Sequence, residues 1–366
     1  MEKNNEPTEP SRDWSSGEGA DFSDLELDPE TGGINQIAPS ETVSVEVEMV
    51  SPSIFDEAEP ASMLTSERLL QDKARPNVVP ETFWRRLVFG MSFGKLNPGD
   101  NKRVLARKAL DSRITANLTG KTRFVPVLTR KGGVGKTTVT ALIGMALSMA
   151  REDRILAIDA NPDRGTLSER VPKGTTKTVR DIVNKASSIT GFTVFSEYVS
   201  RDKTRLDVLA SDTDPMISEA FDEGDYNVVA DIASRYYSIC LTDCGTGIVH
   251  SVMRAILQRA DSMVVVSGGS IDEARLASET LTWLEANGYA DVVKDCVVAL
   301  NTATFGTELV KLDEIEAHFK TRVRAVVRIP YDPQLAAGAE VNFEKLHPAT
   351  KQAARDLAAL VVDGLA

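Results

Sequence analysis

Apolar runs alternate with stretches of helical periodicity from about residue 122 to the end of the chain. Short apolar runs bounded by turn residues are typical of buried strands, and apolar residues three or four positions apart are typical of packed helices. On this basis strands are predicted over residues 124–128, 154–158, 205–209, 237–242, 262–267, 296–300 and 325–329. The alternation predicts an α/β fold, with a doubly wound, mostly parallel sheet.

Helical patterns follow several of these strands. One begins near Thr138 and runs to Met149, and a second spans Ile271 to Ala286 and ends at Asn287-Gly288, a common stop signal. The pattern from Ala353 to Val362 predicts a packed closing helix. Pro126 conflicts with its predicted strand, because proline removes a hydrogen-bond donor from the sheet.

Charge divides the N-terminal part of the chain into two segments of opposite sign. Residues 1–60 carry 16 Asp and Glu against 2 Lys and Arg, a net charge of −14. Without sustained apolar periodicity, residues 1–65 are expected to form a disordered acidic tail. Residues 42–50 alternate Val with Glu, which leaves open whether they form a solvated linker or a strand on a partner.

The segment that follows, residues 66–121, is a basic lead-in to the domain at 122–366. Residues 85–123 hold ten Lys and Arg against Asp100 and Asp111. Aromatic and aliphatic side chains lie beside arginines at 83–89, as would suit a membrane surface, a nucleic acid or the acidic tail. The alternative is that this segment docks on the domain while its charges stay solvated.

Three cysteines, each in or beside an apolar strand, indicate a reduced protein. No apolar run is long enough to span a bilayer, and the acidic start is unlike a signal peptide. A cytoplasmic location is therefore expected, with peripheral membrane contact still open.

The most informative segment is Lys131-Gly-Gly-Val-Gly-Lys-Thr-Thr138, between a predicted strand and a predicted helix. Glycines let backbone amides face a phosphate, a lysine neutralises phosphate charge, and a hydroxyl ligates Mg²⁺. The pattern predicts binding of ATP and Mg²⁺, with Thr137 as a metal ligand. The nucleotide-binding residues expected here are Gly132, Gly133, Val134, Gly135, Lys136, Thr137 and Thr138.

The generic phosphate loop requires glycine at position 130, where this chain has Arg130. The deviant Walker A form K-G-G-x-G-K-[ST]-[ST] is present, and it resembles the MinD/ParA family of P-loop ATPases. The resemblance implies an ATP hydrolase that forms an ATP-dependent homodimer. It also implies that Lys131 reaches the nucleotide of the partner and that Lys136 holds the β and γ phosphates.

Two further segments resemble metal and switch segments of that family. Asp159 ends the strand Arg154 to Ile158 and matches the first acid of the switch motif D-x-D, which supports the Mg²⁺ water shell. The second position, which orients the attacking water, is Asn161, and an amide cannot take up a proton as a carboxylate does. Asp243 matches the Walker B acid and is the other expected metal ligand. The catalytic residues implied are Lys131, Lys136, Asp159 and Asn161.

Residues 84–350 resemble more narrowly the EspI-type ATPases of type VII (ESX) secretion, through segments such as 157–167, 243–247 and 281–289. The wider family implies that Asn301 and Pro330 contact the adenine. The resemblance implies an ATP-dependent dimer switch serving a secretion apparatus, with a protein partner on the N-terminal region. Two alternatives remain: a partitioning ATPase that binds DNA nonspecifically, and a nucleotide-gated adaptor that hydrolyses little ATP.

Overall fold

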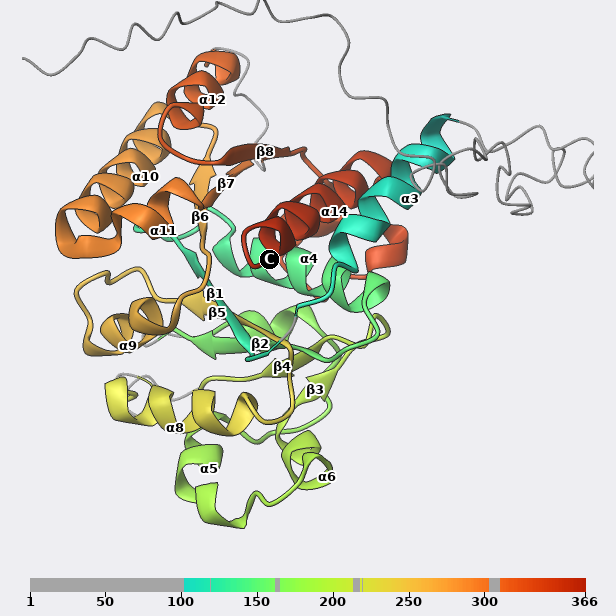
Figure 1. Ribbon diagram of the computed structural model, residues 1–366, viewed down its shortest axis with the longest axis vertical. Helices are drawn as coiled ribbons and strands as arrows, with labels where there is room; N and C mark the ends of the chain where they lie inside the picture. Colours follow the sequence, from blue (N-terminus) through green and yellow to red (C-terminus); the bar gives the residue numbers. More distant parts are fainter. Residues whose placement is uncertain (1–101, 119, 162–164, 213–217, 219, 303–309) are drawn as a thin grey trace, which may run out of the picture. The chain divides into compact units, whose positions relative to one another are not determined.

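The computed structural model describes residues 102–366, except 119, 162–164, 213–217, 219 and 303–309 (Figure 1). The predicted acidic tail and the first part of the basic lead-in, up to residue 101, lie outside the described residues. All described residues belong to one compact unit.

The described strands form one sheet in the order β3-β4-β2-β5-β1-β6-β7-β8. Every neighbouring pair is parallel except β3 with β4. The bounds are β1 (Arg123–Leu128), β2 (Ile155–Ala160), β3 (Ser200–Arg201), β4 (Asp207–Leu209), β5 (Ile239–Cys244), β6 (Val264–Gly268), β7 (Val297–Asn301) and β8 (Ala325–Ile329). Because β1 lies between β5 and β6, the segments after these three strands leave the sheet at the same edge.

Helices cover both faces of the sheet, which confirms the doubly wound α/β prediction (Figure 1). One face packs against α3 (Lys102–Ile114), α4 (Lys136–Ala150) and α14 (Pro348–Asp363). The short α13 (Pro333–Ala336) lies on the same side. The other face packs against α5 (Val179–Asn184), α6 (Phe192–Phe195), α8 (Glu223–Ala233), α9 (Ser251–Arg259), α10 (Ile271–Leu284), α11 (Ala290–Lys294) and α12 (Leu312–Lys320).

Helix α4, which contains the helical pattern predicted at 138–149, lies deep in the domain. It is buried over nearly its whole length, because α3 and α14 cover the side that faces away from the sheet. At Gly144 a β-carbon would come within 2.8 Å of the Leu206 side chain and 3.3 Å of the Leu241 side chain in β5, so the helix approaches the sheet closely there. The close packing anchors α4, and with it the loop that precedes the helix.

Pro126 does occupy the central strand, and the sheet accommodates it. The Arg123 amide donates to Ser238 O on the β5 side, whereas the Phe124 amide donates to the Asp261 carboxylate on the β6 side. Backbone N–H groups alternate in direction along a strand, so an N–H at position 126 would face β6, as the Phe124 N–H does. Pairing with β6 begins only at Val127. The missing donor therefore falls where β6 has not yet joined the sheet, and no ladder bond is lost.

The strand predicted over 205–209 begins at Asp207. Arg205 has φ of 75°, a left-handed conformation that cannot continue a strand. The Asp202 carboxylate holds this turn by accepting hydrogen bonds from the Thr204 and Leu206 amides, both at 3.0 Å. Alternation of apolar residues alone did not reveal a turn stabilised by a side chain.

Candidate functional site

The glycine-rich loop connects β1 to α4, as the motif predicted. Gly133 and Gly135 have φ of 81° and 95°, conformations that residues with a side chain rarely adopt. A β-carbon at Gly135 would lie 2.2 Å from Asn301 Nδ2. That nitrogen donates to Val134 O at 2.8 Å, so Asn301 braces the loop from the end of β7.

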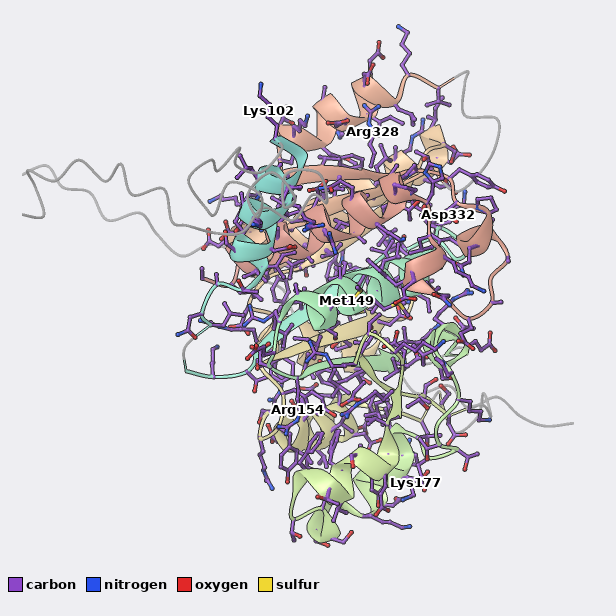
Figure 2. The ribbon with its side chains drawn as sticks, turned by 90° about the vertical axis from the view of Figure 1, so that its right-hand side faces the viewer. Lys102, Met149, Arg154, Lys177, Arg328 and Asp332 are labelled. Carbon is purple, nitrogen blue, oxygen red and sulfur yellow. The ribbon has the colours of Figure 1, made fainter. Side chains whose placement is uncertain are left out.

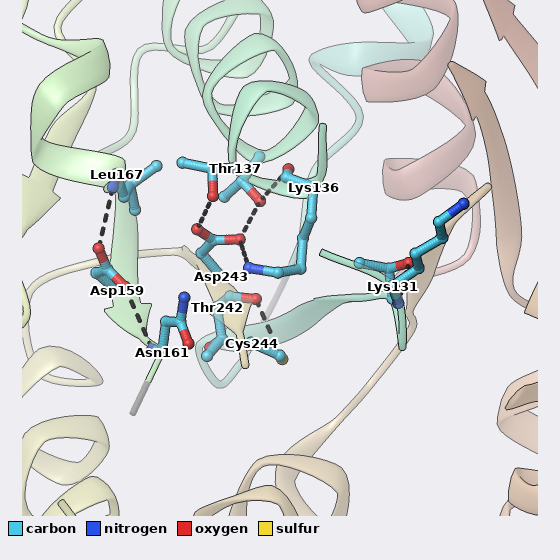
Figure 3. A network of polar contacts seen from close by, with 11 residues as sticks. Lys131, Lys136, Thr137, Asp159, Asn161, Leu167, Thr242, Asp243 and Cys244 are labelled. Atoms are coloured by element: carbon cyan, nitrogen blue, oxygen red, sulfur yellow. Dashed lines mark hydrogen bonds and ion pairs between the residues drawn. The ribbon is translucent and has the colours of Figure 1, made fainter. Parts of the chain in front are cut away.

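Lys136, Thr137 and Asp243 form a hydrogen-bonded cluster at the start of α4 (Figure 3). Lys136 Nζ lies 2.5 Å from Asp243 Oδ1, and the Thr137 hydroxyl donates to Asp243 Oδ2 at 2.7 Å. The Thr140 hydroxyl donates to Lys136 O at 3.1 Å and approaches Asp243 Oδ1 at 3.3 Å. Asp243 is fully buried and Lys136 is 7% exposed, so the ion pair lies in a low-dielectric environment.

Asp159 lies beside Asp243, because the parallel register of β2 and β5 pairs the two positions. Its carboxylate accepts hydrogen bonds from the Leu167 amide at 3.0 Å and the Asn161 amide at 3.2 Å. Burial, followed by the charge of Asp243, raises the pKa of Asp159 to about 7. The backbone hydrogen bonds and Lys136 only partly offset these two effects.

Two buried carboxylates beside a hydroxyl fit a divalent cation. Carboxylate and hydroxyl oxygens are hard donors of the kind that Mg²⁺ prefers. The charge of Asp243 contributes to the raised pKa of Asp159, so the two carboxylates repel each other when both are ionised, and a cation between them would offset that repulsion. Thr137, Asp159 and Asp243, the predicted metal ligands, are therefore suited to hold Mg²⁺ together.

Asn161 follows β2 at the edge of the same site. Its backbone N–H donates a hydrogen bond to the Asp159 carboxylate, and its backbone carbonyl oxygen accepts one from the Ser218 hydroxyl at 3.0 Å. The next switch residues, including Asp163, lie outside the described residues. Position 161 thus carries an amide where the family motif has a second carboxylate.

Lys131 points away from the Lys136 cluster (Figure 3). Its Nζ lies 3.4 Å from Glu273 Oε1, and the lysine side chain is 40% exposed. Glu273 also accepts a hydrogen bond from the Ser270 amide at 3.1 Å and so caps α10. The upstream lysine therefore engages a neighbouring helix instead of the buried carboxylates.

The predicted phosphate-binding residues line one cleft of about 400 Å³. Its walls also include Asn161, Asn301 and Pro330, so both predicted adenine contacts border the same space as the glycine loop. A larger groove of about 710 Å³ lies along β8, α14 and α3. Of the predicted site residues Pro330 alone borders that groove, so the chemistry points to the smaller cleft.

Several cleft residues were not identified from the sequence. Thr166 and Arg170 line it from the switch side, and Asp332 and Gly338 line it from the segment around α13. Thr166 lies in the segment 157–167 that carries the narrower resemblance, but none of the four residues was given a role. Each follows a predicted strand, at the sheet edge where ligands bind in α/β proteins.

The raised pKa of Asp159 predicts a pH dependence of stability without nucleotide or metal. Between the ordinary pKa of 3.8 and the raised pKa of about 7, Asp159 keeps its proton in the folded state, whereas in the unfolded state, where its pKa has the ordinary value, it has lost it. The stability gained from this proton is complete below about pH 4 and is lost as the pH rises through about 7. We expect the melting temperature to fall more between about pH 5.5 and pH 8 in the parent than in Asp159→Asn. Parallel slopes for the two proteins would contradict a perturbed Asp159.

No helix within the described ranges has the length and apolar character needed to cross a membrane.

The parallel sheet, the glycine loop and the buried carboxylates define a P-loop nucleotide-binding protein. The chain belongs to the family of the CobQ/CobB/MinD/ParA nucleotide binding domain, which it matches over residues 125–341. The resemblance drawn from the sequence to the MinD/ParA family is thereby confirmed.

Among curated relatives, the chain is 33% identical over 288 residues to the ESX-1 secretion-associated protein EspI of Mycobacterium tuberculosis H37Rv. The alignment covers 78% of this chain and 43% of EspI, so the chain spans less than half the length of this relative. A putative septum site-determining protein MinD of Nephroselmis olivacea is 30% identical over 172 residues, 46% of this chain and 61% of that protein. The narrower resemblance to EspI is also confirmed.

Solved structures support the fold. A ParA family ATPase from Chlorobium tepidum TLS aligns with a TM-score of 0.55 at 21% identity, over 65% of this chain and 97% of that chain. The septum site-determining protein MinD complexed with Mg-ADP from Pyrococcus horikoshii OT3 aligns with a TM-score of 0.52 at 20% identity, over 65% and 94%.

Proposed function

We propose that this protein is an ATP-dependent dimer switch that hydrolyses ATP and serves a type VII (ESX) secretion apparatus. The observation that carries the proposal is the arrangement of the two lysines. Lys136 is buried and paired with Asp243, whereas Lys131, five residues earlier in the same loop, is directed away from this carboxylate. Sedimentation with and without Mg-ATP, combined with phosphate release, tests both parts of the proposal.

Within one chain, the roles follow from charge and burial. The glycine-loop amides and Lys136 bind the phosphates, and Thr137, Asp159 and Asp243 hold Mg²⁺. When bound, Mg²⁺ neutralises charge that develops on the transferred phosphoryl group. Asp243 holds Lys136 at the site before ATP arrives, and on ATP binding Lys136 would exchange this carboxylate for the phosphates while Asp243 would turn to Mg²⁺.

Two exposed apolar side chains support a dimer interface on the glycine-loop side. Val249 is 82% exposed and precedes α9, and Ile271 is 63% exposed and begins α10. These segments follow β5 and β6, the two neighbours of β1, so they leave the sheet at the edge that carries Lys131. Burying such residues against a second copy would favour association.

Glu273→Gln is expected to promote ATP-dependent dimerisation. Lys131 must leave Glu273 to reach a partner, and an exposed ion pair of this kind contributes up to about 1 kcal/mol. Glutamine keeps the capping interaction with Ser270 but removes the charge. The protein concentration for half-dimerisation in Mg-ATP should fall about two- to tenfold by sedimentation velocity. An unchanged or raised midpoint would show that the pair with Glu273 does not compete with dimerisation.

The secretion assignment is supported by the identity with EspI, which is described as ESX-1 secretion-associated. We place the protein in the cytoplasm, with the secretion-apparatus partner on the N-terminal region. A pull-down from cells with and without residues 1–65 tests this partner assignment.

A partitioning ATPase that binds DNA nonspecifically is the second candidate, based on the basic segment at 85–123. In the described part of this segment, several side chains already pack or pair within the domain, which weakens that candidate. Leu110 and Ile114 of α3 are buried in the core, and Arg113 pairs with Asp363 at 2.5 Å. Lys121 and Arg123 both pair with Asp261. DNA binding with a steep salt dependence would favour partitioning nevertheless.

A nucleotide-gated adaptor is the third candidate, and Asn161 favours it. An amide at this position can orient water but cannot accept its proton. Tight Mg-ATP binding and dimerisation without phosphate release would support the adaptor.

A further inference from the structure

Arg170 ends the 3₁₀ turn Leu167–Arg170, which begins at the residue whose amide binds Asp159. It lines the nucleotide cleft opposite Gly338, on the wall formed by the switch side. No sequence motif and none of the roles proposed above includes it. Its place in the cleft therefore requires an explanation.

The polar contacts of Arg170 leave part of its guanidinium unused. Within the described residues, its side chain donates a single hydrogen bond, from Nη1 to Ala339 O at 3.3 Å. Its Nε–H is buried with no acceptor among those residues. Buried donors in proteins usually have an acceptor, and a ligand bound in the cleft can supply one to this nitrogen.

The other cations of the cleft are already engaged. Lys136 lies on Asp243 and Lys131 lies on Glu273. Burial lowers the pKa of Arg170, and the charges of Glu169 and then Asp243 oppose this effect. The guanidinium lines the same cleft as the glycine loop, and no carboxylate in the described part of the chain forms an ion pair with it.

We infer that Arg170 binds the phosphate chain of the nucleotide held by its own subunit. An arginine is always charged, and its planar set of N–H donors suits phosphate oxygens. The inference rests on the proposed ATP binding and adds a residue to it.

Arg170 also connects the two walls of the cleft. Its carbonyl oxygen accepts a hydrogen bond from the Val341 amide at 2.9 Å, and its Nη1 donates to Ala339 O. This backbone bond survives any side-chain substitution, so the walls stay linked when the guanidinium is removed. A substitution of Arg170 therefore tests the role of the guanidinium charge and leaves the backbone link between the walls in place.

The experiment compares Arg170→Gln and Arg170→Lys with the parent in the full chain. Affinities for Mg-ATP, Mg-ADP and adenosine are measured by competition against a fluorescent adenine nucleotide. Arg170→Gln should weaken Mg-ATP and Mg-ADP about tenfold and leave adenosine within about twofold, since a hydrogen bond to a charged group is lost. Arg170→Lys should recover part of the loss. Arg235→Gln, at an exposed position outside the cleft, is the matched control and should change nothing.

Two results would overturn the inference. Equal weakening of all three ligands, with a lower melting temperature of the nucleotide-free protein, would make Arg170 a structural support only. Unchanged affinities in Arg170→Gln would show that it does not contact the nucleotide. Failure of the parent to bind Mg-ATP would instead contradict the proposed function itself, so the two failures are distinguishable.

Discussion

Lys131→Ala is expected to abolish ATP-dependent dimerisation while ATP binding stays measurable, and Lys136→Ala is expected to weaken ATP binding itself. Lys131 is 40% exposed and contacts Glu273, so its removal disturbs no buried group. Lys136 is buried at the metal site, where loss of a charged hydrogen-bond donor to phosphate should reduce affinity about 10- to 100-fold. Sedimentation velocity in Mg-ATP and equilibrium nucleotide binding measure the two effects.

The two variants differ in their effect on the fold, and this difference must be controlled. Removing Lys136 leaves the buried Asp243 without its cation, and breaking a buried pair in this way costs about 3–5 kcal/mol. Breaking the exposed pair of Lys131 costs at most about 1 kcal/mol. Thermal melting should therefore separate the variants before any binding measurement. If folded Lys131→Ala dimerises with ATP as the parent does, the cross-interface role is wrong.

The sheet was predictable from the sequence because its strands are buried on both faces. Such strands appear as continuous apolar runs, and every predicted strand boundary lies within two residues of the observed one. The left-handed turn at Arg205 delays β4 by two residues, and the short antiparallel β3 has no apolar run and was not predicted. The backbone leaves the helical conformation at Asn287 and Gly288, where the stop signal was predicted.

The site was predictable only where one segment of chain supplies the chemistry. The phosphate loop is contiguous, so its residues could be read directly from the motif. Asp159 and Asp243 could be proposed from family resemblance, but their position side by side depends on the β2–β5 register, which one sequence does not reveal. Arg170 and Asp332 reach the cleft from separate segments, and no sequence pattern assigned a role to either residue. Asn301 was expected at the adenine, and its bond to Val134 adds a contact that no sequence pattern indicated.

Asn161→Asp is expected to accelerate ATP hydrolysis by about 10²- to 10⁴-fold, the usual contribution of a positioned general base. Asn161 borders the cleft and lies next to Asp159, where the family motif has its second acid. The substitution also places a third carboxylate near Asp159 and Asp243, so the variant should require less Mg²⁺ for half-maximal rate, because added negative charge strengthens the binding of a divalent cation. Single-turnover phosphate release across a Mg²⁺ titration measures both effects.

Asn161→Ala is the matched control, because it removes the amide without adding a base. If the parent is a slow ATPase whose amide orients water, Asn161→Ala should be slower still and Asn161→Asp faster. Asp163, which lies outside the described residues, offers the competing source of a carboxylate. If Asp163 supplies the carboxylate that positions the water, Asp163→Asn would slow hydrolysis and Asn161→Asp would change the rate little. Should the parent hydrolyse ATP rapidly and neither Asn161→Asp nor Asp163→Asn change the rate, the attacking water is positioned by other groups, and the switch-segment assignment fails.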